Sequence, residues 1–470
     1  DDGSCFECGE DQVMGARVTD CAWACEEDWG ACYSTDDEGA CTFYFCEALT
    51  ACTEDEAPED AYAAERAQIA ALAELTEAPV MRADDVTQDV TEVAPGQTKG
   101  VYFDALPYQG QDTRVFARIG LPAGASAESP VPGVVLVHGG GGSAYSAWVA
   151  EWTSRGFAAI SIAVEGQNDT PASQSDLDGG QAVGSWQKHQ MAGPARVGAY
   201  GDVSEPVADQ WMVHAVADTV LANSLLRALP EVHAEQVGLV GISWGGVIAS
   251  MAMGVDDRFA FSVPIYGTGH KYDIPNYFGS ALVNNEPYRE LWDPFLWVSS
   301  AEMPALWLSW PKENHFSHDS QAATYHAAPG ARMVSLVPGM GHGHGAAWSR
   351  PESYAFAQSV IDAGAPWAQQ QTVGAVDGDA QAVFTSAKPL SGASLFYATE
   401  TGYTGDMSWN EVAVSELIEA PPGTWTLSAE LPAGTTGWFF NATTNDGLVL
   451  SSDYQEEITV NVSPAEGVMI

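Results

Sequence analysis

Between residues 96 and 365, short apolar runs alternate along the chain with longer segments of helical periodicity. The apolar runs are rich in Val and Ile, as is typical of buried strands, and the longer segments predict covering helices. Regular alternation of the two predicts an α/β domain with a mostly parallel sheet, entered by two antiparallel strands. The expected strands are 101–103, 114–121, 133–137, 157–164, 237–242, 259–265, 305–308 and 333–337, and the expected helices are 144–154, 211–229, 247–253 and 351–362.

Three further segments flank this predicted α/β domain of residues 96–365. Residues 1–56 contain every cysteine of the chain and predict a Cys-rich disulfide module. Residues 57–95 are acidic and Ala-rich, so we expect a connector with a helix over 61–75. Residues 366–470 are rich in Thr, Ser, Gly and aromatic residues in short alternating runs, which predicts a C-terminal β-sandwich.

The cysteines favour disulfides over a metal site. An even number of cysteines in a short stretch is typical of a disulfide framework, whereas zinc, the alternative, is disfavoured because no His lies nearby. Disulfides need an oxidising compartment and no leader precedes Asp1, so we expect a mature secreted, periplasmic or cell-surface protein. The cysteines concerned are Cys5, Cys8, Cys21, Cys25, Cys32, Cys41, Cys46 and Cys52.

The strongly negative net charge argues against anionic binding partners. The 63 acidic residues outnumber the 17 basic ones and give a formal net charge of −46. Such a surface repels nucleic acids and anionic membranes, and no apolar run is long enough to span a bilayer. We interpret the excess of carboxylates as adaptation to salt, with an ordinary acidic extracellular protein as the alternative.

Residues 241–245 (GISWG) match the pattern G-x-S-x-G directly after an apolar strand and before a small-residue helix. In this setting the serine stands at the apex of a strained strand-to-helix turn, and the glycines let the two backbones approach. The N-terminus of the following helix favours negative charge at this point. The alternative is a tight turn with an incidental serine. We interpret Ser243 as a nucleophile because the sequence also contains a candidate oxyanion loop, acid and base, described next.

A glycine run, His138 to Gly142, follows an earlier strand. In hydrolases with this kind of turn, the oxyanion is bound by the amide after the nucleophile and by an amide of the earlier loop. We therefore expect an oxyanion hole formed by Trp244 with Gly140 or Gly141, and we expect His138 to order the loop by hydrogen bonding. A flexible loop is one alternative. A dinucleotide-binding loop is another, but its G-x-G-x-x-G pattern is not met.

The acid and the base should follow the nucleophile in that order. Glu313 is the first carboxylate after the strand 305–308, and we choose it as the acid that orients the base. Asp319 is the alternative, although its position favours a helix N-cap. The loop after the last strand supplies His342 as the expected general base, with His344 as the alternative.

Several segments resemble a family of bacterial secreted α/β hydrolases labelled acetyl xylan esterases, dienelactone-hydrolase-like proteins or prolyl-oligopeptidase-family proteins. The resemblance implies an α/β-hydrolase fold with a serine nucleophile, and it excludes the Cys-rich module. One departure lies in the acid loop, which generally reads Gly-Thr-Asn-Asp in the family and Trp-Pro-Lys-Glu here, at 310–313. The segments that carry the resemblance are 214–226, 241–246 (GISWGG), 254–259 (GVDDRF), 263–267 (VPIYG), 341–344 (GHGH) and 431–436 (LPAGTT).

The leading hypothesis is a serine esterase that deacylates, and more specifically deacetylates, a polysaccharide without a cofactor or metal ion. The alternatives are a broad carboxylesterase for polyesters or phenolic esters, a serine peptidase, and an inactive glycan-binding protein. Aromatic residues at strand ends and in the inserts, Trp186, Tyr266 and Trp292, are candidates for substrate binding. The acidic stretches 176–178 and 377–379 resemble Ca²⁺ ligands but are expected to be solvated turns.

Overall fold

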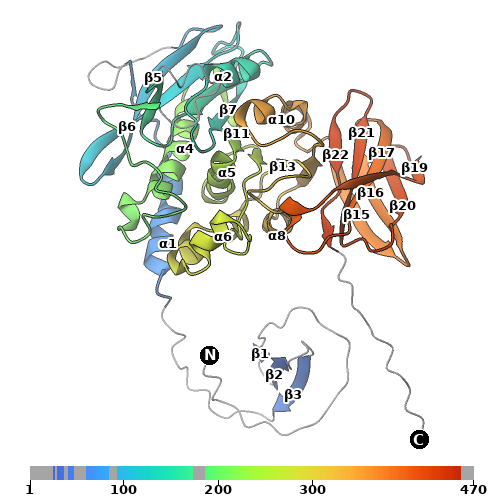
Figure 1. Ribbon diagram of the computed structural model, residues 1–470. Coiled ribbons are helices and arrows are strands. Elements are labelled where there is room, and N and C mark those ends of the chain that lie inside the picture. The colour runs from blue at the N-terminus through green and yellow to red at the C-terminus, as the bar shows by residue number, and fades with distance from the viewer. Residues whose placement is uncertain are drawn as a thin grey trace, which may run out of the picture. The chain divides into compact units, whose positions relative to one another are not determined.

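The computed structural model describes residues 60–83, 93–172 and 186–456, together with the backbone of three strands near the N-terminus (Figure 1). The chain forms two compact units, residues 1–61 and 62–470. The predicted disulfides and the acidic stretch 176–178 lie outside the described residues. The first unit contains an antiparallel sheet of β1 (Cys25–Glu26), β2 (Trp29–Thr35) and β3 (Cys41–Cys46).

The second unit is built on a central, mostly parallel sheet. Six strands run parallel in the order β8-β7-β11-β12-β13-β14, and β6, β5 and β4 extend the β8 edge in antiparallel fashion. Every residue of β8, β12 and β13 is buried, which explains their uninterrupted apolar runs. This is an α/β-hydrolase fold. The strands are β4 (Met81–Arg82), β5 (Thr98–Tyr108), β6 (Gln111–Gly120), β7 (Val131–Val137), β8 (Ala158–Ile162), β11 (Val232–Ile242), β12 (Ser262–Ile265), β13 (Ala305–Ser309) and β14 (Arg332–Leu336).

Helices between the strands pack on this sheet: α4 and α5 contact β7 and β11, α2 contacts β6 and β8, and α10 contacts β13. No helix of the described residues is long and apolar enough to cross a membrane. The helical elements are α1 (Ala63–Ala70), η1 (Ala71–Glu74), α2 (Ser146–Thr153), η2 (Val207–Asp209), α4 (Trp211–Arg227), α5 (Trp244–Val255), α6 (Tyr277–Leu282), η3 (Tyr288–Trp292), α7 (Pro294–Val298), α8 (His318–Ala327), α9 (His344–Trp348), α10 (Pro351–Ala363) and η4 (Thr404–Asp406).

Helix α4 has no exposed face over most of its length, because its residues are buried from Trp211 to Leu226. The sheet and α5 cover part of its surface, and η1 contacts it as well. The Ser224 hydroxyl donates to the carbonyl oxygen of Leu75 at 2.6 Å, and Leu72 of η1 is buried. The helical segment expected in the connector therefore packs against the hydrolase domain.

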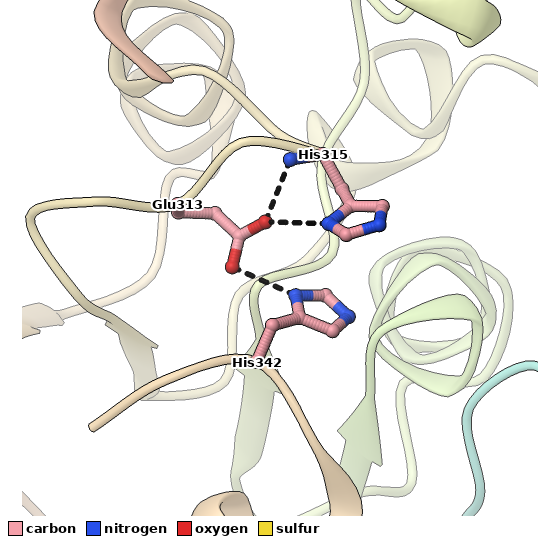
Figure 2. A group of neighbouring side chains, drawn as sticks. All are labelled: Glu313, His315 and His342. Atoms are coloured by element: carbon pink, nitrogen blue, oxygen red, sulfur yellow. Dashed lines mark hydrogen bonds and ion pairs between the residues drawn. The ribbon is translucent and has the colours of Figure 1, made fainter. Parts of the chain in front are cut away.

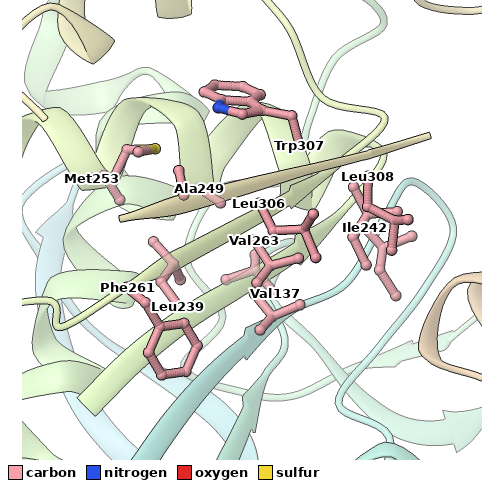
Figure 3. Close-up of a cluster of buried hydrophobic side chains, with 14 of the residues drawn as sticks. Val137, Leu239, Ile242, Ala249, Met253, Phe261, Val263, Leu306, Trp307 and Leu308 are labelled. Atoms are coloured by element: carbon pink, nitrogen blue, oxygen red, sulfur yellow. The ribbon is translucent and has the colours of Figure 1, made fainter. Parts of the chain in front are cut away.

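Buried aliphatic and aromatic side chains form the core against the central sheet (Figure 3). Phe261 is fully buried and lies over Gly238 of β11, where an added Cβ would come within 2.1 Å of its ring. Each fully buried side chain of this type contributes about 1.5–3 kcal/mol. The strand ends that carry the candidate site are therefore held by a rigid core.

The C-terminal region forms two antiparallel sheets, and one of them is continuous with the central sheet (Figure 1). β22 pairs with β14 through Ser451 and Val334, so the predicted β-sandwich shares a sheet with the hydrolase domain. The sheets are β15-β16-β20-β19 and β18-β17-β21-β22. Beside them, β23 pairs with β21, and a separate two-stranded sheet is formed by β9 (Gln167–Pro171) and β10 (Trp186–Lys188). The C-terminal strands are β15 (Ala368–Val376), β16 (Asp379–Ser386), β17 (Leu390–Ala398), β18 (Asn410–Ala413), β19 (Glu416–Glu419), β20 (Thr424–Glu430), β21 (Gly437–Thr444), β22 (Val449–Ser451) and β23 (Gln455–Glu456).

The acidic stretch at residues 377–379 is the turn between β15 and β16. Asp377 and Gly378 have φ angles of 54° and 88°, and Val376 pairs directly with Asp379. Two central residues with positive φ are typical of a two-residue hairpin turn. The exposed carboxylates here therefore belong to a solvated turn, the interpretation that the sequence favours.

Candidate active site

Ser243 lies at the sharp turn between β11 and α5, with φ 57° and ψ −116°. Only close packing of the two backbones permits this strained conformation. An added Cβ at Gly241 would lie 1.9 Å from the carbonyl oxygen of Gly245, and one at Gly245 would lie 2.1 Å from that of Val137. The two glycines of the G-x-S-x-G pattern are thus required by contact distances, and the turn presents the serine as predicted.

His342 links this serine to a carboxylate. Its Nε2 lies 2.9 Å from Ser243 Oγ. Its Nδ1 lies 2.8 Å from Glu313 Oε2, the contact drawn in Figure 2. The three side chains come from the turn after β11, the loop after β13 and the loop after β14. The structure therefore brings together the nucleophile, acid and base proposed from the sequence.

The Glu313 carboxylate is completely buried, and both of its oxygens have donors. Oε2 accepts from Trp310 Nε1 at 2.9 Å as well as from His342, and Oε1 accepts from the backbone N–H of His315 at 2.8 Å. Burial raises the pKa of this carboxyl, but the hydrogen bonds from His315 and His342, together with the charge of His342, outweigh burial and lower the pKa to about 2. Glu313 is therefore ionised at neutral pH.

The imidazole of His342 is held between two rings. Tyr266 stacks on it at a centroid distance of 4.3 Å and an angle of 23°, and His315 packs against it at 4.4 Å and 33°. Tyr266 also donates from its hydroxyl to the carbonyl oxygen of Gly341 at 2.6 Å, which fixes the residue before His342. These contacts restrict both the ring and the loop that carries it.

The glycine loop after β7 passes directly over Ser243. An added Cβ at Gly139 would lie 3.0 Å from Ser243 Cβ, and the N–H of Gly139 donates to His344 Nε2 at 2.9 Å. The Gly139 amide is thus engaged, which leaves the amides of Gly140 and Gly141 as loop donors. The amide of the following Trp244 lies at the first position of α5, where a backbone N–H lacks an intrahelical acceptor.

His138 holds this loop from beneath. Its Nδ1 donates to the carbonyl oxygen of Gly139 at 2.7 Å, and its Nε2 accepts from the backbone N–H of Val164 at 3.1 Å. Gln167 lies between the ring and the carbonyl oxygen of Gly142, at 3.0 and 2.9 Å. Burial lowers the pKa of His138 to about 4, so the ring is neutral and orders the loop, as expected from the sequence.

The two alternatives to the chosen acid and base lie elsewhere. His344 begins α9, and its Nε2 is bonded to the oxyanion loop; burial lowers its pKa to about 4. Asp319 is exposed in the first turn of α8. The expectation that Asp319 is the N-cap is wrong, because Ser317 occupies that position and the helix begins at His318.

Two of the three aromatic candidates for substrate binding are buried, so that assignment is corrected. Tyr266 is 1% exposed and is covered by its stacking on His342, while Trp292 is fully buried and donates to Gln210 Oε1 at 2.6 Å. Only Trp186 is partly exposed near the site, where its Nε1 donates to the carbonyl oxygen of Gly141 at 3.0 Å. Aromatic content alone does not distinguish a core residue from a binding residue.

Sequence reasoning missed three residues that border the site. His315 and Trp310 contact Glu313 directly, and Arg196 lies 4.7 Å over the ring of Trp244. A His two positions after the proposed acid was a usable signal for the first. Trp310 and Arg196 reach the site through the three-dimensional course of their loops, so the local sequence pattern offered no comparable signal for them.

Glu313, His315 and His342 also present donor atoms within 4.8 Å of one another, close enough to hold a metal ion. A transition metal there would have to displace the proton between His342 Nδ1 and Glu313 Oε2. Because that proton keeps the imidazole in the tautomer that can accept from Ser243, such an ion would inhibit acyl transfer.

Comparison with known proteins places this chain in a family. Residues 52–300, more than half of the chain, match the sequence model described as acetyl xylan esterase (AXE1). The match includes the glycine loop and Ser243, and it ends before Glu313 and His342. No curated protein matches the chain significantly.

Among solved structures, an acetyl xylan esterase from Paenibacillus sp. R4 is 18% identical, with 63% of this chain and 92% of that chain covered and a TM-score of 0.45. Acetyl xylan esterase 1 from Thermoanaerobacterium sp. JW/SL YS485 is 15% identical, with 60% and 89% covered and a TM-score of 0.44. A puromycin-hydrolyzing peptidase from Mycobacterium tuberculosis is 17% identical, with 58% and 42% covered and a TM-score of 0.41. By its family match, this chain belongs to the acetyl xylan esterase family of carboxylic ester hydrolases.

Proposed function

We propose that this protein is a secreted serine esterase that removes acetyl groups from a polysaccharide such as xylan through an acyl-enzyme. One observation carries the catalytic part of the proposal. His342 bridges Ser243 Oγ and the buried Glu313 carboxylate with contacts of 2.9 and 2.8 Å. That chain of groups is what a hydroxyl needs in order to attack an ester at neutral pH.

In the first step, Ser243 Oγ attacks the ester carbonyl while His342 Nε2 takes its proton. The carbonyl oxygen becomes negative and accepts from the N–H groups of Trp244 and of Gly140 or Gly141. His342 then protonates the departing alcohol oxygen as the bond from carbonyl carbon to alcohol oxygen breaks. Glu313 stays ionised throughout and stabilises the imidazolium.

In the second step, water replaces the alcohol. His342 Nε2 takes a proton from that water, the hydroxide attacks the acyl carbon, and the proton returns to Ser243 Oγ as the acid departs. The same oxyanion donors act in both steps. The site thus needs no cofactor to complete the cycle.

Family membership supports the acetyl group and the polysaccharide in this proposal, and the clustered cysteines support secretion. A substrate panel tests the chemistry. We expect activity on p-nitrophenyl acetate and acetylated xylan, falling with acyl length, and none on a peptide p-nitroanilide. Equal activity across long acyl chains favours a broad carboxylesterase, cleavage of the anilide favours a peptidase, and complete inactivity favours a binding protein.

The catalytic roles are tested with Ser243→Ala and His342→Ala. Each is expected to lower turnover of p-nitrophenyl acetate by at least about a thousandfold. Asp319→Asn serves as a control, because this exposed carboxylate of α8 lies outside the hydrogen-bonded chain. Substantial activity in either alanine variant would contradict the assignment.

A further inference from the structure

Two histidines share the Glu313 carboxylate, although the mechanism uses only one. His342 Nδ1 contacts Oε2 at 2.8 Å, and His315 Nδ1 lies 3.3 Å from Oε1. Figure 2 shows that each ring turns one nitrogen toward the carboxylate and the other to the opposite side. On His342 that other nitrogen, Nε2, is the one at Ser243 Oγ. The Nε2 of His315 therefore faces the same side as the nucleophile.

The His315 ring is placed to meet a substrate. Its Nδ1 is buried against Glu313, yet 42% of the side chain is exposed, so ring atoms other than Nδ1 are open to solvent. The ring lies 4.4 Å from that of His342, which protonates the departing alcohol. The two rings thus lie close together, and each turns its Nε2 away from Glu313 (Figure 2).

We propose that His315 is a specificity residue for the alcohol part of the ester, and that its Nε2 binds the hydroxyl next to the esterified one. This rests on the proposed function, because it places the alcohol oxygen at His342 Nε2. Oxygens on adjacent carbons are close enough for one to meet each ring. A hydroxyl both donates and accepts, so either tautomer of His315 can bind it. The site would then prefer monoesters of vicinal diols, the arrangement found in partly acetylated sugars.

A neighbouring aromatic side chain extends this surface. Tyr277 is 53% exposed, and its ring meets that of His315 edge to face at 6.5 Å. Phe278 packs against the Tyr277 ring at 4.0 Å and fixes its orientation. An exposed, fixed aromatic ring beside a hydrogen-bonding imidazole is suited to the apolar face and the hydroxyl edge of a sugar ring.

The test uses a pair of esters that differ only in the second hydroxyl, ethylene glycol monoacetate and propyl acetate. The ratio of their kcat/KM values reports on acylation, the step in which the alcohol departs. In the wild-type protein we expect a preference of about fivefold to tenfold for the glycol ester, as one partly exposed hydrogen bond provides. In His315→Phe, which keeps a ring against His342 but removes both nitrogens, we expect the ratio to fall to about one. Asp319→Asn, which alters a nearby exposed group, should keep the wild-type ratio.

Two outcomes would overturn the proposal. One is a wild-type ratio near one, which shows that the hydroxyl is not recognised. The other is a His315→Phe ratio equal to that of the wild type, even if both rates fall, because His315 would then only position His342. The proposed function fails separately, since its failure would appear as activity of Ser243→Ala on both esters.

Discussion

Replacing Glu313 by Gln tests how the site controls the tautomer of its base. The carboxylate oxygens accept three hydrogen bonds, from Trp310 Nε1, the backbone N–H of His315 and His342 Nδ1. An amide of the same shape has one oxygen, so one of its two positions becomes a donor. If the oxygen stays on the His315 amide, the new N–H₂ faces both Trp310 and His342 Nδ1. His342 can then avoid a donor–donor contact only by moving its proton to Nε2, where it can no longer accept from Ser243.

The expected loss in kcat is about 10³- to 10⁴-fold, which corresponds to about 4 to 5 kcal/mol of transition-state stabilisation. The assay is turnover of p-nitrophenyl acetate, with circular dichroism to establish that the variant is folded. Asp319→Asn makes the same chemical change at an exposed position of α8 and should retain wild-type turnover. A folded Glu313→Gln variant within about tenfold of the wild type would refute the reasoning.

Other predictions follow from packing, titration, charge and domain structure. Gly241→Ala should lower the free energy of unfolding by several kcal/mol because its Cβ would lie 1.9 Å from a carbonyl oxygen, whereas Gly374→Ala, with no atom within 4 Å, should change it little; urea unfolding compares them. The pKa of Glu313 falls from 4.5 to about 2 on folding, so its stabilisation is complete above pH 4.5 and lost as the pH drops toward 2; Glu313→Gln should flatten that part of the stability–pH curve. Because salt screens repulsion within a chain of net charge −46, the melting temperature should rise between 0.05 and about 1 M NaCl; a steady fall in both melting temperature and activity would contradict adaptation to salt. Truncation after Gly364 removes β22, which pairs with β14, and should abolish turnover of p-nitrophenyl acetate; an assay of the purified truncated protein checks this.

The sequence predicts the parts of the site that depend on local pattern. Ser243 follows a recognisable strand and precedes a small-residue helix, and Glu313 and His342 each follow a buried strand at its carboxyl end. Parallel strands bring such ends to one edge of the sheet, so strand order and residue type were sufficient to predict the three groups. Their spacing in the sequence, by contrast, carried little information.

The parts that failed depend on contacts between distant segments. Tyr266 and Trp292 have the composition expected of binding residues, but one packs on His342 and the other is in the core. The sharing of a sheet by the hydrolase domain and the C-terminal region depends on the pairing of β22 with β14, for which no turn or periodicity in the sequence gives a signal. Burial and pairing of this kind are set by the whole fold, and a local pattern is compatible with several outcomes.

The C-terminal sheets hold both loops that complete the site. On the side of the base, the backbone N–H of Leu336, at the end of β14, donates to Ser451 Oγ at 2.7 Å, and Asn441 Nδ2 donates to the Leu336 carbonyl oxygen at 2.9 Å. On the side of the acid, the backbone N–H of His318 donates to Thr404 Oγ1 at 2.8 Å, and the hydroxyl of Tyr403 donates to the carbonyl oxygen of Asn314. Strand β14 would otherwise be an open edge of the central sheet, and its loop carries the base. The distance between Glu313 and His342 is therefore fixed partly from outside the hydrolase domain, which makes the C-terminal region part of the catalytic scaffold rather than an independent appendage.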